Sequence, residues 1–207
     1  MKPLKKTLCL ALLFVVSVTI SVPAQSSDED EGNVQADSAA AQRQLASREP
    51  LERQRAAEEL ARLAEIGNRK LLEGYRLQEK NARVKLALDW ALYRIGKTES
   101  LFAVVNSLDS SRAAQASSYL ITLETPDPLY LFLERVNGNT QIKLLEVLAK
   151  IGDVGTLERI KPHAASFDPK VAEAARLATR DIEQRIGETP TDRSTRPRQV
   201  GNGENSP

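Results

Sequence analysis

Cysteine, histidine and aromatic residues are scarce in this chain. It has one cysteine, one histidine and one tryptophan among 207 residues, and aromatic residues make up 4%. The single cysteine, Cys9, lies inside an N-terminal apolar run, so the remaining chain cannot form an internal disulfide. Because 41% of the residues are hydrophobic but few are aromatic, we expect a core of leucine, isoleucine, valine and alanine.

The chain also lacks an excess of charge of either sign. Lysine and arginine total 29, and aspartate and glutamate total 28. Binding to a nucleic-acid backbone draws its affinity from clustered positive charge that displaces counterions. No such cluster stands out, so we do not expect nucleic acid to be the partner.

Residues suited to catalysis are few. His163, the only histidine, follows Pro162 at the predicted end of a helix, and one imidazole without a thiol does not make a zinc site. The sequence has no strand–turn–helix elbow for a nucleophile and no glycine-rich phosphate loop. We therefore interpret His163 as a surface residue at a helix end. We expect no catalytic activity, no metal and no cofactor.

The N-terminal segment has the pattern of a secretory signal peptide. Lysines at positions 2, 5 and 6 precede a nearly continuous apolar run over positions 8–22, and Val22-Pro23-Ala24 offers small residues for cleavage. The run is shorter than the about 20 residues of a spanning helix. We predict that residues 1–24 are removed and that the protein is periplasmic or secreted. The alternative is an uncleaved segment that anchors the chain in the inner membrane.

Two further segments are poor in large apolar residues. Residues 25–42 hold five acidic residues and no basic one, and residues 188–207 are rich in Gly, Pro, Thr, Arg and Asn. Such segments bury too little apolar surface to offset the entropy of ordering. We predict an acidic flexible linker over 25–42 and a disordered tail over 188–207.

The intervening part contains an internal repeat. Residues 62–67 (RLAEIG) recur at 91–96 (ALYRIG) and at 147–152 (VLAKIG), with a degenerate copy at 119–124 (YLITLE), so the step is 28 or 29 residues. Each period predicts two short amphipathic helices. Short helix pairs cannot bury their apolar sides alone, but stacked pairs can.

Breaks between the two helices of a pair carry recognisable signals. Gly96 and Gly152 suit left-handed helix stops, and Thr98 and Asp153 suit caps of the helices that follow. Pro126 suits the first turn of the second helix in the third period. Residues 168–186 read as one long helix that closes the array, and residues 38–48 as a segment that caps its other end.

This pattern of an apolar helix ending in Ile-Gly, a polar capping residue and a second apolar helix resembles the HEAT repeat. It is most similar to the short bacterial variety named after phycobilisome lyases. The resemblance implies an all-α fold, a right-handed α-solenoid of about four to five helix pairs over residues 43–187. A tetratricopeptide array, the main structural rival, has a period of 34 residues. The chain departs from the family pattern at Gln141, where earlier copies have Arg55, Arg83 and Arg112, and in the third copy, which has no glycine.

In such arrays the second helices usually line a concave binding surface. Arginine and tyrosine often carry the binding energy of interfaces. The polar candidates on the predicted second helices are Arg69, Lys70, Tyr75, Arg76, Asn106, Tyr130, Arg135 and Arg159. Trp90, in a first helix, is expected to belong to the core or to line a groove.

The function that these observations favour is that of an exported scaffold or adaptor that binds a protein partner and has no enzymatic activity. Members of the family that it resembles include scaffolds, adaptors and a few pigment-attaching enzymes. Two alternatives stay open. One is a lyase-like protein with a small-molecule or pigment pocket between repeats, and the other is a membrane-anchored spacer in the cell envelope.

Overall fold

The computed structural model describes residues 28–188, which form ten α-helices joined by short 3₁₀ turns, with no strand in this range. The predicted signal peptide and all but the first residue of the predicted tail lie outside the described residues. Among the described residues, no helix has both the length and the apolarity to cross a membrane. The helices are α1 (Asp28–Gln44), α2 (Pro50–Leu63), α3 (Arg69–Gln78), α4 (Ala82–Arg94), α5 (Leu101–Asn106), α6 (Ala113–Ile121), α7 (Asp127–Leu133), α8 (Gly138–Ile151), α9 (Val154–Ile160) and α10 (Pro169–Glu188).

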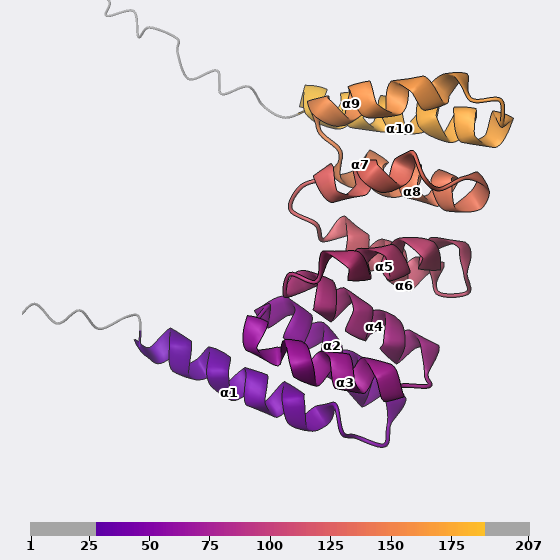
Figure 1. Ribbon diagram of the computed structural model, residues 1–207. Helices are drawn as coiled ribbons and strands as arrows, with labels where there is room; N and C mark the ends of the chain where they lie inside the picture. Colours follow the sequence, from indigo (N-terminus) through magenta and orange to yellow (C-terminus); the bar gives the residue numbers. More distant parts are fainter. Residues whose placement is uncertain (1–27, 189–207) are drawn as a thin grey trace, which may run out of the picture.

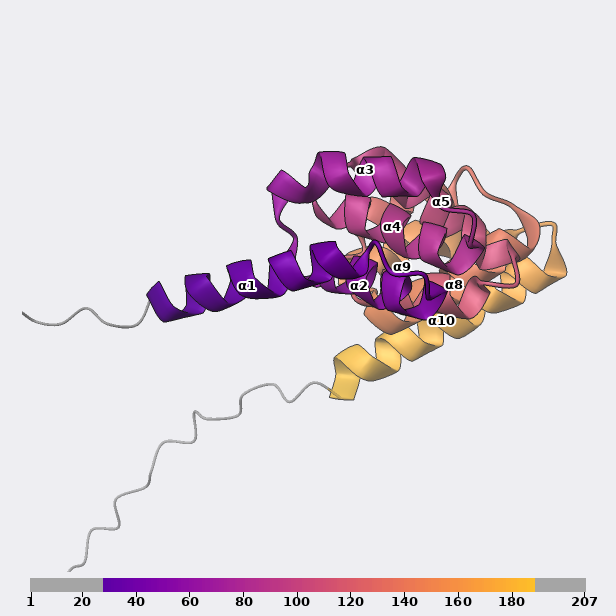
Figure 2. The same cartoon turned by 90° about the horizontal axis from the view of Figure 1, so that it is seen from below.

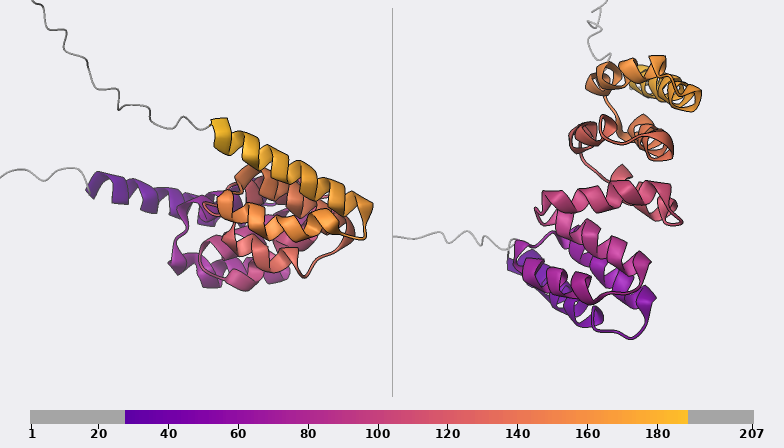
Figure 3. Two further views of the ribbon diagram at one scale, coloured as in Figure 1. Left: turned by 90° about the horizontal axis from the view of Figure 1, so that it is seen from above. Right: turned by 45° about the vertical axis from the view of Figure 1, so that its right-hand side comes forward.

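The helices follow one another through space in chain order. Figure 1 shows α1, α2 and α3 at one end of the molecule and α9 and α10 at the other. We call α2, α4, α6, α8 and α10 the first-helix row, because α2 packs along α4, α6 contacts both α4 and α8, and α8 packs along α10. The remaining helices α3, α5, α7 and α9 form the second-helix row, and each packs against a member of the first row. The two rows are separated most clearly in the right-hand view of Figure 3.

The interior is built of leucine, as the composition predicts. The largest fully buried side chains are all leucines, at positions 45, 60, 72, 88, 92, 108, 120, 129, 133, 144, 145 and 148. Each contributes about 1.5–3 kcal/mol relative to an exposed position. These leucines come from both rows, and the core they form with isoleucine, valine and alanine runs from Ala41 in α1 to Ile182 in α10.

The prediction of a flexible linker over residues 25–42 is wrong from Asp28 onward, where α1 begins. Ser38 and Ala41 of α1, and Leu45 directly after it, are buried at helical spacing against the rest of the fold. Ser38 donates a hydrogen bond to Glu65 at 2.6 Å, and Gln42 donates one to Asn68 at 2.6 Å. These contacts fall within residues 38–48, the segment expected to cap this end of the array, where a serine, an alanine and one leucine, together with a polar network, are enough to hold one side of the helix. The second half of α1 therefore packs on the body, and its first half projects beyond it (Figure 2).

Some of the predicted helix boundaries are confirmed. Asp153 accepts a hydrogen bond from the backbone N–H of Thr156 at 2.9 Å, and the Thr156 hydroxyl accepts one from the Asp153 N–H, which makes a complete capping box. Gly96 has φ +97° and ends α4 in the left-handed region. The single long helix predicted over 168–186 is α10.

The predicted cap at Thr98 is wrong, and the first copy of the motif ends its helix in another way than the second. Thr98 makes no capping hydrogen bond, since it opens a 3₁₀ turn (Thr98–Ser100) that precedes α5. In the first copy of the motif the helix α2 stops at Leu63, where Ala64 takes the left-handed conformation with φ 52°. Gly67 then lies in a 3₁₀ turn (Ile66–Asn68).

Gly152 is a glycine for a different reason from the predicted left-handed stop. Its φ of −63° and ψ of 154° are open to any residue. A Cβ atom at this position would lie 2.5 Å from the carbonyl oxygen of Leu148, 2.8 Å from Thr156 Cγ2 and 2.9 Å from Ile182 Cδ1. The glycine is needed because α8, α9 and α10 meet there without room for a side chain.

We expect Gly152→Ala to lower the free energy of unfolding by about 2 kcal/mol or more, because the added methyl group overpacks this junction. Gly74→Ala is the matched control. Gly74 lies inside α3 with nothing within 4 Å of its missing Cβ, so alanine there should stabilise by about 0.5–1 kcal/mol. Urea unfolding followed by circular dichroism measures both, and equal effects of the two substitutions would contradict the packing account.

Candidate functional site

The first-helix row has two hollows in its surface, one on each side of α6. The aromatic hollow, of about 540 Å³, is lined by Glu58, Ala61, Arg62, Trp90, Arg94, Ser118, Tyr119 and Thr122. The apolar groove, of about 690 Å³, is lined by Ser117, Ile142, Glu146, Ala149, Lys150, Pro169, Lys170, Glu173, Ala174, Leu177, Ala178 and Asp181. Helix α6 contributes to both, so the two hollows are neighbours on one surface.

The composition of α6 explains why the surface is hollowed there. Its partly or fully exposed positions include Ala113, Ala114, Ser117 and Ser118, which are all small. The Ser118 hydroxyl donates to the carbonyl of Gln115 in its own helix at 2.7 Å. Because these side chains are small, they extend less far from the helix than the side chains of α4 and α8, and space remains on both sides of α6.

The floor of the apolar groove combines small and aliphatic side chains. Ala149 comes from α8, and Ala174 and Ala178 come from the facing side of α10. Leu177 stands at the groove with 43% of its surface exposed. An apolar hollow with an exposed leucine is a typical contact area for another apolar side chain.

The border of the apolar groove is charged. Glu146 pairs with Lys143 at 2.8 Å, and Glu173 pairs with Arg176 at 3.3 Å. Within the described residues, Lys150, Lys170 and Asp181 form no ion pair. Exposed pairs of this kind contribute little to stability, so the border charges remain free to act in recognition.

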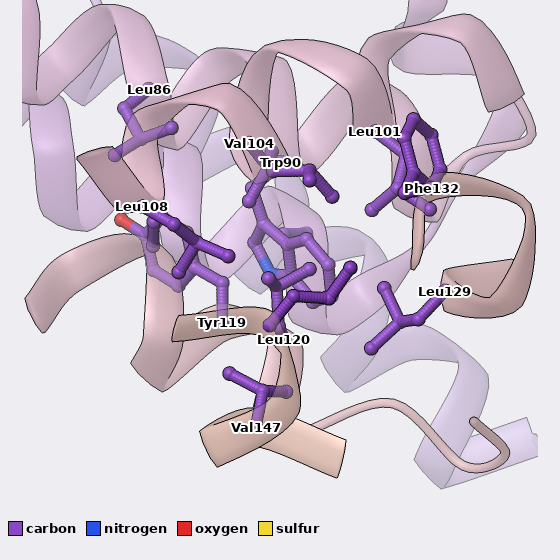
Figure 4. Close-up of a cluster of buried hydrophobic side chains, with 14 of the residues drawn as sticks. Leu86, Trp90, Leu101, Val104, Leu108, Tyr119, Leu120, Leu129, Phe132 and Val147 are labelled. Atoms are coloured by element: carbon purple, nitrogen blue, oxygen red, sulfur yellow. The ribbon is translucent and has the colours of Figure 1, made fainter. Parts of the chain in front are cut away.

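The aromatic hollow is built on a pair of stacked rings. Trp90 in α4 lies parallel to Tyr119 in α6, with ring centroids 5.5 Å apart and an interplanar angle of 9° (Figure 4). Trp90 is 5% exposed, so the prediction that it belongs to the core or lines a groove is confirmed on both counts. The guanidinium carbon of Arg94 lies 5.8 Å from the centroid of the indole, a cation–π distance.

Hydrogen bonds hold the tyrosine of this hollow. The Tyr119 hydroxyl donates to Glu58 Oε1 of α2 at 2.5 Å and accepts from Gln115 Nε2 at 2.7 Å. Gln54 also donates to Glu58 Oε1, at 2.9 Å. Burial, with a smaller contribution from the Glu58 carboxylate, raises the pKa of Tyr119 well above its ordinary value. Tyr119 is therefore a neutral phenol at physiological pH, and Glu58 is occupied by two donors.

Seven of the eight residues predicted as a binding surface lie on the second-helix row, Arg135 follows the end of α7, and their environments differ. Lys70, Asn106 and Arg135 are exposed, and Arg69 is exposed and pairs with Glu73 at 3.4 Å. Arg159 is also exposed and lies over the Tyr130 ring, whereas Tyr75, Arg76 and Tyr130 are partly buried and engaged in the fold.

Only two of the eight are brought together. The guanidinium of Arg159 in α9 lies 5.5 Å from the ring centroid of Tyr130 in α7, and the Tyr130 hydroxyl bonds Thr156 Oγ1 at 2.7 Å. Sequence reasoning did not single out Arg94, Tyr119 as a stacking partner, or Leu177. The signal that could have indicated this surface is the run of small residues at the exposed positions of the degenerate third repeat.

Arg76 joins two helices. It donates to both carboxylate oxygens of Asp89 in α4, at 2.7 and 3.2 Å, and the side chain of Asp89 is 9% exposed. A bidentate pair with a buried carboxylate orders both partners. Arg76 thus has a structural role between α3 and α4, whatever else it contacts.

His163 lies at a helix end, as predicted, in a 3₁₀ turn (Lys161–Ala165) after α9. It is half-buried, and its Nδ1 atom is 3.2 Å from the side-chain nitrogen of Gln141. Because an amide nitrogen only donates, this contact requires an unprotonated Nδ1. Burial lowers the pKa of His163, and the nearby Glu134 carboxylate offsets this only in part.

The described residues contain no group of histidine, cysteine, aspartate or glutamate side chains that could hold a metal ion. Over residues 28–188 the protein is all-helical, with two adjacent hollows on its first-helix row. Comparison with known protein families and with curated proteins finds no match for the chain.

We expect the histidine NMR signals of the chain to titrate with a midpoint below the ordinary value of about 6.5. His163 is the only histidine, so the assignment needs no mutant. Because the pKa of His163 is lower in the folded state, the unfolded chain binds a proton at a pH where the folded chain does not. The free energy of unfolding therefore falls as the pH decreases through 6.5. A midpoint at or above 6.5 would contradict the burial of an unprotonated ring.

We expect Arg76→Ala to lower the free energy of unfolding by about 2–3 kcal/mol, because it leaves the Asp89 carboxylate buried without its partner. Arg69→Ala removes an exposed arginine from the same helix and should change stability by no more than about 0.5 kcal/mol. Thermal and urea unfolding compare the two. Similar losses in both variants would show that the Arg76–Asp89 pair contributes nothing specific.

Proposed function

We propose that the chain is an exported scaffold protein that binds a protein partner through its first-helix row. The observation that carries this proposal is the apolar groove between α6, α8 and α10, a hollow of about 690 Å³ with Leu177 exposed beside it. A soluble protein gains nothing for its own stability from leaving such a surface open. A partner that covers the groove would bury it.

The fold that we propose for this scaffold is the right-handed α-solenoid of HEAT-like pairs that the sequence pattern implies. Helices that pair and stack in chain order support it (Figure 1). The two terminal helices support it as well, because an array needs polar outer surfaces at its ends. In α10 the exposed residues include Glu173, Arg176, Arg180, Glu183 and Arg185, and in α1 they include Gln35, Asp37, Arg43 and Gln44.

The occupant that we propose for the groove is the apolar side of an amphipathic helix from the partner. Side chains at positions i, i+3, i+4 and i+7 of a helix project together, and such anchors fit a broad hollow with an alanine-rich floor. The charged border offers groups to the polar flanks of that helix. The proposed export, with cleavage after Ala24, places the encounter in the periplasm or outside the cell.

The test is affinity purification of the full chain, carrying a C-terminal tag, from its own cell envelope after mild cross-linking. Leu177→Arg places a charge in the groove and should abolish recovery of the partner. The matched control is Leu77→Arg, because Leu77 is a leucine of α3 that is 81% exposed and lies away from the groove. Both substitutions are at exposed positions, so neither should unfold the protein.

A third variant tests the second-helix row. It combines Arg69→Glu, Lys70→Glu and Arg135→Glu, all at exposed positions, and leaves Arg76 in place to preserve its pair with Asp89. Loss of the partner with Leu177→Arg, and its retention in the other two variants, supports the first-helix row. Loss of the partner in the second-row variant alone would assign the binding surface to the residues first predicted. Retention of the partner in all three variants would contradict both proposed binding surfaces.

A further inference from the structure

The aromatic hollow contains a cation that the protein itself does not neutralise. Arg94 forms no ion pair within the described residues and is only partly exposed. The nearby Arg62 is already paired with Glu59 at 2.5 Å. The one acidic lining residue, Glu58, accepts from Tyr119 and Gln54. An anion that enters the hollow therefore finds Arg94 available.

Stacking on Trp90 leaves Arg94 prepared for such a contact. A guanidinium that lies over an aromatic face still presents its N–H groups at its own edge, in the fork that matches a carboxylate. Trp90 is fixed by its stack with Tyr119, and Tyr119 is fixed by Glu58, so the support beneath Arg94 is rigid. Binding of a carboxylate would therefore cost little conformational entropy at Arg94, because this side chain is already ordered.

The charges at the apolar groove have the same bias. Among the described residues that line the two hollows, the cations without an ion pair are Arg94, Lys150 and Lys170, and the acids without one are Glu58 and Asp181. The unpaired lining charges therefore have an excess of one positive charge, which favours a partner with acidic groups at this surface. Electrostatic complementarity of this kind selects among partners that share the same apolar anchors.

We propose that the partner is an acidic amphipathic helix that crosses α6, with its apolar anchors in the apolar groove and a carboxylate side chain on Arg94 in the aromatic hollow. This inference rests on the proposed function and adds the chemistry of the partner. Two interhelical steps of about 8–10 Å separate α4 from α8. At a rise of 1.5 Å per residue, the acidic residue lies about 11–13 residues from the centre of the apolar anchors.

The chain provides its own probe, because Trp90 is its only tryptophan and lines the hollow. The ligands are two blocked helical peptides of about 20 residues. Both carry leucines at positions i, i+3, i+4 and i+7 near one end and no aromatic residue. At the polar positions toward the other end, one peptide has glutamate and the other has lysine. Tryptophan emission of the full chain is recorded as each peptide is added.

We expect the glutamate peptide to change the emission of Trp90 saturably and to bind about tenfold or more tightly than the lysine peptide, as one charge-assisted contact requires. Arg94→Glu should reverse the preference, and Arg94→Gln should abolish it. Arg69→Glu makes the same change of net charge on the second-helix row and should keep the preference of the unaltered chain. Circular dichroism confirms that each variant is folded.

Equal binding of the two peptides, binding of neither, or the same response in Arg94→Glu and Arg69→Glu would overturn the inference. These outcomes are distinct from failure of the proposed function. If the envelope partner is lost with Leu177→Arg while the peptides show no preference, the scaffold stands and its partner is not acidic. If Leu177→Arg leaves the envelope partner bound, the groove itself is not the docking surface.

Discussion

The helices of this chain are too short to be stable on their own in water, and the packing of leucine between them is the constraint on which the structure depends. Most α-helices here have between six and fourteen residues, a length at which an isolated helix is marginal. Each therefore needs a neighbour to cover its apolar side. The fully buried leucines spread from Leu45 to Leu148 meet this need along nearly the whole stack.

Close packing of this kind also decides where the molecule is hollow. The first-helix row brings its helices into direct contact, and α6 meets its neighbours with alanine and serine at the positions that face outward. Larger side chains at those positions would fill the space on both sides. The small residues on the outward side of α6 thus leave the aromatic hollow and the apolar groove open.

The interactions that lock the structure are polar as well as apolar. Arg76 with Asp89 and Tyr119 with Glu58 each join residues of different helices. Partly buried contacts of this type are costly to leave half made, so they fix which helix faces lie together. Arg76 and Tyr130, which the sequence suggests as recognition groups, are thus engaged within the fold. Arg94, by contrast, lies over the Trp90 ring and has no acidic partner among the described residues.

The sequence by itself determined the helical class, the approximate positions of α2 to α10 and several ends, because these follow from local periodicity and from local chemistry. Asp153 caps α9 through its own turn, and Gly96 ends α4 through its own backbone angles. Only the tertiary structure decided that α1 begins as early as Asp28, and that Ile182, thirty residues away, helps to close the space beside Gly152. The same holds for the stack of Trp90 on Tyr119 beneath Arg94. Contacts of this kind join residues that are distant in the chain, and a local pattern carries no information about which distant surface will cover it.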